Sequence, residues 1–263
     1  TTSAKIRSLV QKAKSLVKPS PSIWVISGTE CIPIFSSYFR SIKKTRFIYT
    51  HSLEYEFFHF SEMRPEIDSS LKNNYILVLD QGWFSKPKPD FLTDKQYPPA
   101  SRPTFSKEMR LFLIRLTEIL GTEVLVSCHP KANLEDTKKL YKGFEVVDSS
   151  SAELIRHCGV ALANTSTSVG YAVMAKKPLI LFTSDELSQS IVNAAEAAIS
   201  TELQIDYFNM SHLDQLDSVA VTDSAPEHQY KMYQQRYIRQ DVASELPLWD
   251  AIFSGLASTD TSL

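Results

Sequence analysis

Short apolar runs alternate with segments of helical periodicity along most of the chain. In the second half, the runs cover residues 124–128, 144–147, 160–163 and 179–182, and helical patterns cover 105–120, 133–142, 150–157, 168–176 and 185–200. Runs this short, without polar residues at alternate positions, are typical of strands buried on both faces of a sheet. Strands that alternate with helices through short connections predict a doubly wound parallel sheet.

The first part of the chain shows the same pattern before prolines interrupt it. Apolar runs at 23–27, 46–50 and 75–79 predict three strands, with a helix over 34–42. Residues 85–104 hold five prolines and no periodicity, which is typical of a connection between domains. We therefore expect an α/β fold of two Rossmann-like domains with parallel sheets flanked by helices: residues 1–104, including the linker 85–104, and residues 105–263. Helices predicted over 225–239 and 246–256 would cross back to the first domain.

Charge and cysteine content exclude several classes of protein. The chain of 263 residues is 43% hydrophobic and has a net charge of -2, so no basic field points to nucleic acid. Its three cysteines are too few for a disulfide framework and lack the C-x-x-C spacing of structural zinc sites, which favours a reducing cytoplasm. No signal peptide or membrane-spanning run is visible. Because the chain starts at Thr1 rather than Met, we expect it to have been shortened.

Residues 1–18 have the pattern of a basic amphipathic helix. They hold five basic residues and no acidic one, and their apolar residues recur at helical spacing. Such a helix either binds an anionic membrane surface or docks on its own domain. Peripheral attachment to the inner membrane is therefore one expectation for this otherwise cytoplasmic protein.

Each predicted strand of the second half ends in a cluster of polar residues, at 127–130, 148–151 and 164–168. The carboxyl ends of parallel strands lie at one edge of a sheet, and ligands bind at that edge in open α/β folds. We interpret this edge as a nucleotide site. His129, whose turn is fixed by Pro130, can donate its Nε2–H to a phosphate oxygen.

The third cluster supplies hydroxyl groups where a helix is predicted to start. Ser166, Thr167 and Ser168 would bind an anion there, together with backbone N–H groups. Simple N-capping is the alternative, but it needs one such residue, and residues 164–168 are all of capping type. Glu153 can bond ribose hydroxyls, although an acid at this position is equally typical of a capping box.

Candidate catalytic groups follow two of the earlier strands. His51, Glu54 and Glu56 come after the second predicted strand. Asp80 comes directly after the third, before Gln81 and Gly82. A carboxylate or imidazole at the tip of a buried strand is placed to act as a general base. For Glu54 and Glu56, the alternative is that they only stabilise the start of a helix. For Asp80, the alternative is an ordinary Asp-x-Gly turn.

Familiar nucleotide-binding motifs are missing from the sequence. It contains neither G-x-G-x-x-G nor G-x-x-x-x-G-K-[ST], which argues against a dinucleotide oxidoreductase and a P-loop ATPase. No Asp-x-Asp pair stands beside a predicted strand, so we expect no metal and no cofactor. What the residues offer is a site built from histidine, hydroxyls and a helix start.

Three short motifs resemble those of bacterial sialyltransferases and capsule polysaccharide transferases. They are Asp80-Gln81-Gly82, His129-Pro130 and Ser166-Thr167, which are similar to that group's acidic pair with Gly, HP pair and Ser/Ser-or-Thr pair. Residues 150–183 also look like the part of polysaccharide-locus glycosyltransferases in which a Ser-Thr step precedes a helix ending in Lys-Pro, here Lys177-Pro178. The resemblance covers roughly residues 45–185.

The resemblance implies a GT-B fold, no metal and a nucleotide-sugar donor, often a CMP-linked nonulosonic acid or Kdo. His129 and Ser166/Thr167 would hold the donor's phosphate, and the acidic motif would supply the base. Gln81 stands where the second acid is expected. Asp80, Glu54 or Glu56 would therefore have to act instead.

The residues and the resemblance together predict a metal-independent GT-B-type glycosyltransferase. It would move a sugar from a nucleotide-sugar donor to a surface-polysaccharide or lipid-linked glycan acceptor, with no nucleic acid as partner. Catalysis is assigned to Asp80, Glu54 and His51, and donor binding to His129, Pro130, Ser166, Thr167, Ser168 and Glu153. The alternatives are a sugar-nucleotide epimerase, a CDP-alcohol phosphotransferase and a degenerate glycan-binding module.

Overall fold

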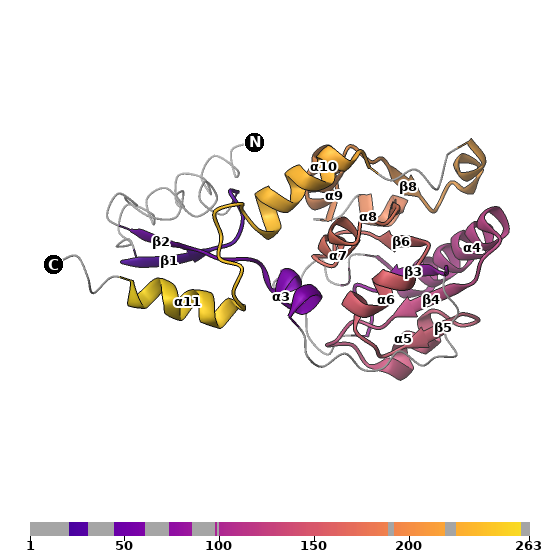
Figure 1. Cartoon of the computed structure of the whole chain (residues 1–263). Coiled ribbons are helices and arrows are strands. Elements are labelled where there is room, and N and C mark those ends of the chain that lie inside the picture. Colours follow the sequence, from indigo (N-terminus) through magenta and orange to yellow (C-terminus); the bar gives the residue numbers. More distant parts are fainter. Residues whose placement is uncertain are drawn as a thin grey trace, which may run out of the picture. The chain divides into compact units, whose positions relative to one another are not determined.

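A computed structural model describes residues 21–30, 45–60, 74–85, 98, 100–188, 192–218 and 225–258. The chain divides into two compact units (Figure 1). The first comprises Thr1–Phe60 together with Met232–Leu263, and the second comprises Ser61–Lys231. The predicted helices over 1–18 and 34–42 lie outside the described residues.

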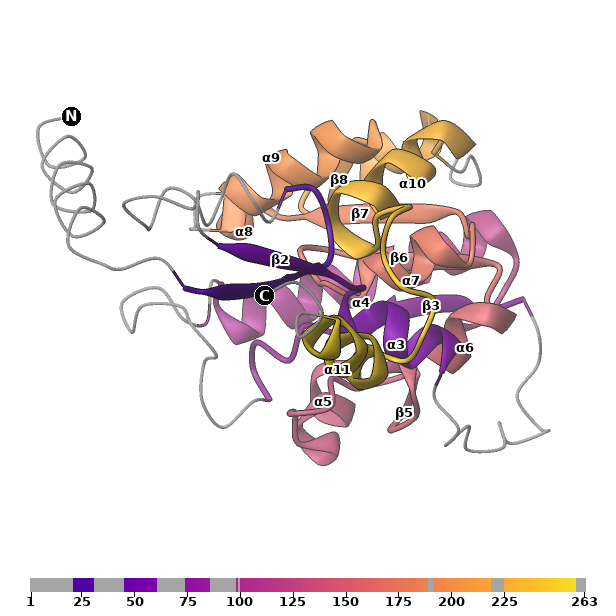
Figure 2. The same cartoon turned by 60° about the vertical axis from the view of Figure 1, so that its left-hand side comes forward.

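The second unit is built on a six-stranded parallel sheet with the strand order β5-β4-β3-β6-β7-β8. Its strands are β3 (Ile76–Leu79), β4 (Val124–Ser127), β5 (Glu145–Val147), β6 (Val160–Ala163), β7 (Leu179–Thr183) and β8 (Tyr207–Asn209). The strands β6 and β3 lie side by side in two views, and Figure 2 also shows β7 next to β6 (Figures 1 and 2). The predicted α/β class with parallel sheets is confirmed. Only β8 has no predicted counterpart, because its three residues form no apolar run.

Helices lie between and after these strands. The periodicity predicts each of them except the 3-10 helix at 213–218, with a single helix over 185–200 where the structure has two. The helices are α4 (Arg102–Leu120), α5 (Leu134–Leu140), α6 (Ser151–His157), α7 (Val169–Met174), α8 (Asp185–Ser188), α9 (Val192–Leu203), the 3-10 helix η1 (Leu213–Ser218) and α10 (Glu227–Tyr233). The longest, α4, begins where the Ser101 side chain accepts a hydrogen bond from the Thr104 N–H. It ends at Gly121, whose φ of 62° is left-handed and suits glycine.

Both faces of the sheet are buried at its four central strands, β4, β3, β6 and β7. Ile76 and Val78 of β3 belong to a core that also contains Met109 and Phe112 of α4. Because side chains alternate along a strand, Leu77 points to the opposite face, and it is fully buried as well. Burial on both faces explains why these strands are continuous apolar runs in the sequence.

The division between the units differs from the predicted boundary at residue 104. Strand β3 pairs in parallel with β4 on one side and β6 on the other, so it lies at the centre of the second unit's sheet. The run at 75–79 is therefore part of the same sheet as the polar clusters. Its composition resembles that of the two earlier strands, and only the pairing partners distinguish it from them.

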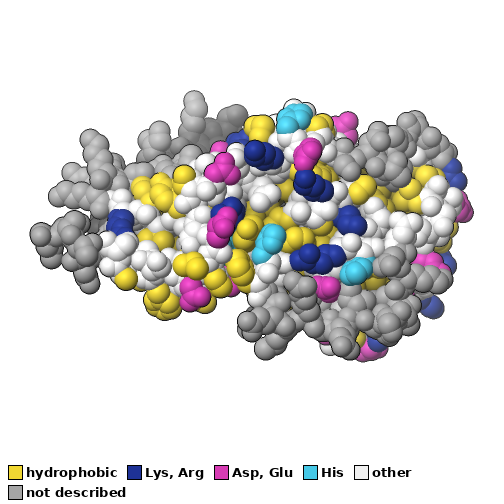
Figure 3. Space-filling model, in the orientation of Figure 1, with side chains coloured by type: hydrophobic (Ala, Val, Ile, Leu, Met, Phe, Trp, Pro, Cys, Tyr) yellow, Lys and Arg dark blue, Asp and Glu magenta, His cyan; other side chains and the backbone are white. Residues whose placement is uncertain are grey.

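The first unit contains a two-stranded parallel sheet of β1 (Ile23–Ile26) and β2 (Arg46–Tyr49). It also contains α3 (Leu53–His59) and, from the end of the chain, the π-helix η2 (Gln234–Ile238) and α11 (Leu248–Ala257). Helix α11 packs against β2. Figure 3 shows hydrophobic side chains on the surface over α11, where Trp249 and Phe253 are exposed. None of the helices in the described residues is both long and apolar enough to cross a membrane.

The C-terminal segment is bound tightly to the turn after β1. The N–H of Thr29 donates to the carbonyl of Gln235 at 3.3 Å, and the N–H of Glu30 donates to that of Arg236 at 3.1 Å. A Cβ at Gly28 would lie only 1.9 Å from the Arg236 carbonyl oxygen. Glycine is therefore required here by close approach of two backbones.

Candidate active site

The strand order of the second unit has one topological switch point. From β3 the chain proceeds to β4 and β5 on one side, and then returns to β6 on the other side of β3. Connections leave β3 and β6 in opposite directions, and in open α/β sheets this divergence forms the crevice where ligands bind. Asp80 follows β3, Asn164 follows β6, and His129 follows β4 one strand away. The structure therefore brings the three predicted motifs to neighbouring strand ends.

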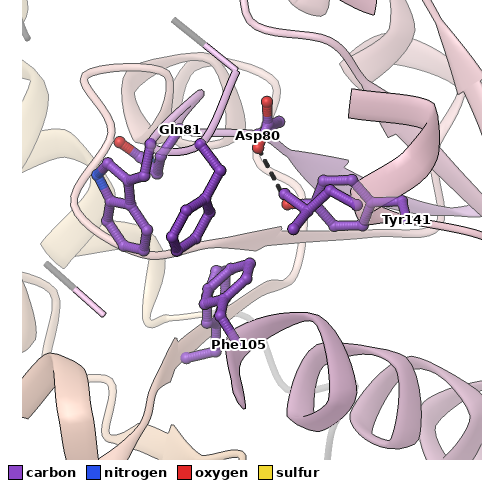
Figure 4. Close-up of a pocket in the computed structure, with 8 residues that line it drawn as sticks. Asp80, Gln81, Phe105 and Tyr141 are labelled. Carbon is purple, nitrogen blue, oxygen red and sulfur yellow. Dashed lines mark hydrogen bonds between the residues drawn. The ribbon is translucent and has the colours of Figure 1, made fainter. Parts of the chain in front are cut away.

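Asp80 is directed into the interior at this edge. Its side chain is 7% exposed, and Oδ1 accepts a hydrogen bond of 3.0 Å from the Tyr141 hydroxyl (Figure 4). Burial, followed by the nearby Asp80 charge, raises the pKa of Tyr141, so the hydroxyl stays protonated and acts as the donor. Asp80 lies in the second unit, whereas the sequence predicted it in the first domain, residues 1–104.

A small pocket beside Asp80 is filled by aromatic packing. Gln81 and Phe105 line it together with Asp80 and Tyr141 (Figure 4). Its interior is too narrow for a water molecule, so it serves as core and has no room for a nucleotide. Gly82 closes the turn with a φ of 65°, a conformation that favours glycine.

His129 has a defined tautomer. Its Nδ1 accepts a hydrogen bond of 3.0 Å from the Lys131 backbone N–H, in the turn that Pro130 begins. A neutral ring with an acceptor at Nδ1 carries its proton on Nε2. The ring is half-buried and Pro130 is exposed. This is the tautomer in which Nε2–H can donate to a phosphate oxygen, as predicted from the sequence.

The segment 166–168 presents hydroxyls but fewer N–H groups than expected. Ser166 Oγ accepts from the Ser168 N–H at 3.1 Å, and the Val169 and Gly170 N–H groups donate to the carbonyls of Ser166 and Thr167. These N–H groups are used inside the turn. Ser168, the N-cap residue of α7, makes no side-chain cap hydrogen bond, and of the three hydroxyls only that of Ser166 accepts from a backbone N–H within this part of the described chain. Any anion contact here must rely mainly on hydroxyls.

A buried acid that sequence reasoning missed supports this loop. Glu196 of α9 is 5% exposed, and its Oε1 accepts from Asn164 Nδ2 at 2.8 Å and from Thr183 Oγ1 at 2.9 Å. Burial raises the pKa of Glu196, while the two hydrogen bonds act to lower it. The only signal in the sequence was an acid surrounded by alanines, Ala194-Ala195-Glu196-Ala197-Ala198.

Glu153 faces its own helix. Its carboxylate lies 3.8 Å from Arg156 Nε and 3.8 Å from His157 Nε2, both in the last turn of α6. Nearer the strand ends, Ser151 Oγ lies 2.7 Å from Ser127 Oγ, which joins the end of β4 to the start of α6. The structure therefore places serines, rather than Glu153, beside His129 along this edge.

The first unit holds a histidine–carboxylate pair. His51 Nε2 lies 2.7 Å from Glu56 Oε2, and the His51 side chain is fully buried. Nε2 therefore carries the proton, and Nδ1 is the basic nitrogen, buried and without a hydrogen-bond partner in the described part of the chain. The Leu248 N–H donates to the same Glu56 oxygen at 2.9 Å. The acid that contacts His51 is therefore Glu56, whereas Glu54 was the one assigned to catalysis.

Within the described ranges, no group of three or more His, Cys, Asp and Glu side chains could hold a metal ion.

Cys128 and Cys158 are buried, free thiols. Burial raises the pKa of both, to about 11 for Cys158, so neither has the character of a reactive thiolate.

No protein-family model and no curated protein matches the sequence. Among solved structures, UDP-GlcNAc 2-epimerase from Methanocaldococcus jannaschii in complex with UDP-GlcNAc and UDP is similar over 81% of this chain and 55% of its own, with 14% identity and a TM-score of 0.44. A second structure of that epimerase is similar over 72% of this chain and 46% of its own, with 13% identity and a TM-score of 0.36.

The glycotransferase of kitacinnamycin is similar over 84% of this chain and 46% of its own, with 11% identity and a TM-score of 0.37. This chain therefore spans about half the length of these structures. At such identities and TM-scores, the likenesses assign no activity to it.

Proposed function

We propose that this protein is a glycosyltransferase that takes its sugar from a nucleotide-activated donor, bound at the carboxyl edge of the six-stranded sheet. The observation that carries the proposal is the switch point between β3 and β6. Asp80, the segment 164–168 and His129 all follow strands at or next to that point. A ligand in such a crevice meets side chains from several strand ends at once.

In this proposal His129 and the hydroxyls of residues 166–168 bind the donor's phosphate. The His129 tautomer leaves Nε2–H as donor, and the hydroxyls rotate to donate to phosphate oxygens. Pro130 fixes the turn that carries His129. Glu153 would have to leave Arg156 and His157 to reach a ribose, so we give it no part in binding the donor.

Transfer breaks the bond between the anomeric carbon and the phosphate oxygen of the donor. The acceptor hydroxyl forms the new glycosidic bond and gives its proton to a base, while the nucleotide leaves with the bonding electrons. Hydrogen-bond donors on the leaving phosphate stabilise the charge that develops there. His129 and the hydroxyls of residues 166–168 would play this part.

Two groups of residues are candidates for the base. The first is Asp80, whose carboxylate already accepts from Tyr141. The second is His51, which Glu56 orients so that Nδ1 is the basic nitrogen. A ring held by a carboxylate in one tautomer is arranged as a general base, and Nδ1 of His51 is buried within the first unit. Glu54 has no described contact with His51, so its assignment to catalysis is the weaker one.

The finer assignments follow from the sequence resemblance alone. They are a CMP-linked nonulosonic acid or Kdo as donor, a surface-polysaccharide or lipid-linked glycan as acceptor, and catalysis without metal or cofactor. Attachment to a membrane through residues 1–18 likewise rests on the sequence alone, since that segment lies outside the part of the chain that the structure describes.

A nucleotide-binding screen tests the donor site directly. The melting temperature of the full chain is measured with CMP, CDP, UDP and GDP, and one nucleotide at about 100 times its Kd should raise it by roughly 5–10 °C. His129→Ala and Ser166→Ala should remove the shift. His157→Ala is the matched control and should keep the shift. His157 is the last residue of α6, at the end of the helix away from Ser151 and the strand ends. No shift with any nucleotide would favour a glycan-binding module.

Turnover separates the chemical alternatives. The nucleotide that shifts the melting temperature selects the sugar donors, which are incubated with a glycan acceptor in the presence and absence of EDTA. Transfer to the acceptor with release of nucleotide is expected, and EDTA should leave the rate unchanged. A sugar nucleotide converted to its epimer, with no transfer, would overturn the proposal in favour of an epimerase.

A further inference from the structure

A second site of different character lies on the flank of the second unit. A surface pocket of about 450 Å³ is formed between α4 and the segment that joins β8 to η1. This volume is within the range of small-molecule pockets. Strand β8 is at the edge of the sheet, three positions from β3, so the pocket is separate from the switch point.

One side of the pocket is apolar. Leu111 of α4, which is 43% exposed, lines this side together with Met210 and Leu213. We call Leu111, Met210 and Leu213 the apolar floor. An exposed leucine that lines a hollow offers surface for an aliphatic group, and each methylene buried there contributes about 0.8 kcal/mol.

The polar side of the pocket centres on Glu108, one turn of α4 before Leu111. Its Oε1 accepts a hydrogen bond of 3.0 Å from Ser211 Oγ, which in turn accepts from the Asp185 N–H at 3.1 Å. Its Oε2 is shielded from solvent and has no hydrogen-bond partner in the residues that the structure describes. A carboxylate oxygen left in this state is costly until a donor reaches it.

The charges around Glu108 are predominantly negative. Asp185 and Glu186 lie close enough to raise its pKa further, after burial as the main cause, while Ser211 and His212 act to lower it. His212 is paired with Asp185 at 3.3 Å. Lys107, the residue before Glu108 on α4, also lines the pocket and brings a positive charge to it. The pocket thus combines the Glu108 carboxylate with the apolar floor, and Asp185 and Glu186 lie near Glu108 without lining the pocket.

We propose that this pocket binds an organic cation of the alkylammonium class, with its ammonium group on Glu108 and its alkyl chain on the apolar floor. An ammonium group supplies a positive charge and hydrogen-bond donors for the Glu108 carboxylate. A metal ion suits the site poorly, since no cluster of three potential ligands occurs in the described chain. The proposal is independent of the glycosyltransferase assignment.

Calorimetric titration of the full chain with n-butylammonium, n-hexylammonium and 1-hexanol tests this proposal. The two further methylenes of the hexyl compound should strengthen binding about tenfold. The alcohol, which has the same chain but no charge, should bind at least about tenfold more weakly than hexylammonium. Binding should also weaken as the pH falls through the raised pKa of Glu108, because the protonated acid attracts no cation.

Glu108→Gln is the decisive variant, because it keeps the oxygen that accepts from Ser211 and removes the charge. It should fold, show no pH dependence and lose hexylammonium binding by tenfold or more. Glu118→Gln, an exposed acid on the same helix, should bind as the wild type does. Equal binding of amine and alcohol, or undiminished amine binding by Glu108→Gln, would overturn the proposal, whatever the nucleotide screen shows.

Discussion

Glu196 and Asn164 form a buried hydrogen bond of 2.8 Å between Oε1 and Nδ2, at the carboxyl end of β6. Asn164 is fully buried, and Thr183 at the end of β7 donates to the same oxygen. One carboxylate thus connects α9 to two strand ends, beside the loop that carries Ser166. We infer that Glu196 positions this loop without itself contacting a ligand.

Replacing Glu196 with Ala should destabilise the protein by about 2–4 kcal/mol. The change leaves the buried amide of Asn164 and the hydroxyl of Thr183 without their shared acceptor, and each unsatisfied group costs about 1–3 kcal/mol. Urea unfolding measures the loss. Glu135→Ala removes an exposed acid paired with Lys138 and should cost no more than about 0.5 kcal/mol. Equal losses in the two variants would contradict the role given to Glu196.

The pH dependence of stability should have opposite signs at two glutamates. The pKa of Glu196 is raised above its ordinary value of 4.5, so its contribution is fully present below 4.5 and is lost as pH rises through the raised pKa. The unfolding free energy of the wild type minus that of Glu196→Gln should therefore fall with increasing pH above 4.5.

Glu227 provides the comparison. A hydrogen bond from the Lys176 ammonium, and then its charge, lower the pKa of this exposed acid. Its contribution is present above the ordinary 4.5 and is lost as pH falls through the lowered pKa. The unfolding free energy of the wild type minus that of Glu227→Gln should therefore rise with pH across that interval. If this difference and the one for Glu196→Gln changed in the same direction with pH, the opposite pKa shifts of the two glutamates would be refuted.

Gly28→Ala should loosen the C-terminal segment of the first unit. The new methyl group would meet the backbone carbonyl of Arg236, which cannot give way as a flexible side chain can. Overpacking of this kind costs about 1–3 kcal/mol or more. Limited proteolysis should then cut within residues 232–258. Gly121→Ala, where no atom lies within 4 Å but φ is 62°, should cost about 1 kcal/mol and leave that segment resistant.

Glu56→Gln should lower kcat by about 100-fold if His51 acts as the base. Gln keeps the acceptor for the Leu248 N–H, but it cannot stabilise the positive charge that His51 acquires. Glu54→Gln is the matched control on the same helix and should keep its rate. The measurement is the initial rate of sugar transfer at saturating donor. A large loss in Glu54→Gln with full activity in Glu56→Gln would reverse the two roles.

The sequence alone was sufficient to identify the strands of the six-stranded sheet, apart from β8. Apolar runs of four or five residues, such as 124–128, are typical of strands buried on both faces of a sheet. Such a run is visible in the local sequence, without knowledge of the strand's partners. The polar clusters at their ends were visible for the same reason. His129 and Ser166 could therefore be placed at one edge before any pairing was known.

The tertiary structure decided which strands pair and which side chains meet. Nothing local in the run at 75–79 distinguishes it from the two runs before it, and its pairing with β4 and β6 moved Asp80 to the second unit. Contacts such as Glu196 with Asn164, or His51 with Glu56 rather than Glu54, depend on side-chain direction and on elements distant in sequence. Hydrophobic periodicity reports which residues are buried, whereas the partner of a buried polar group is set only when the chain packs.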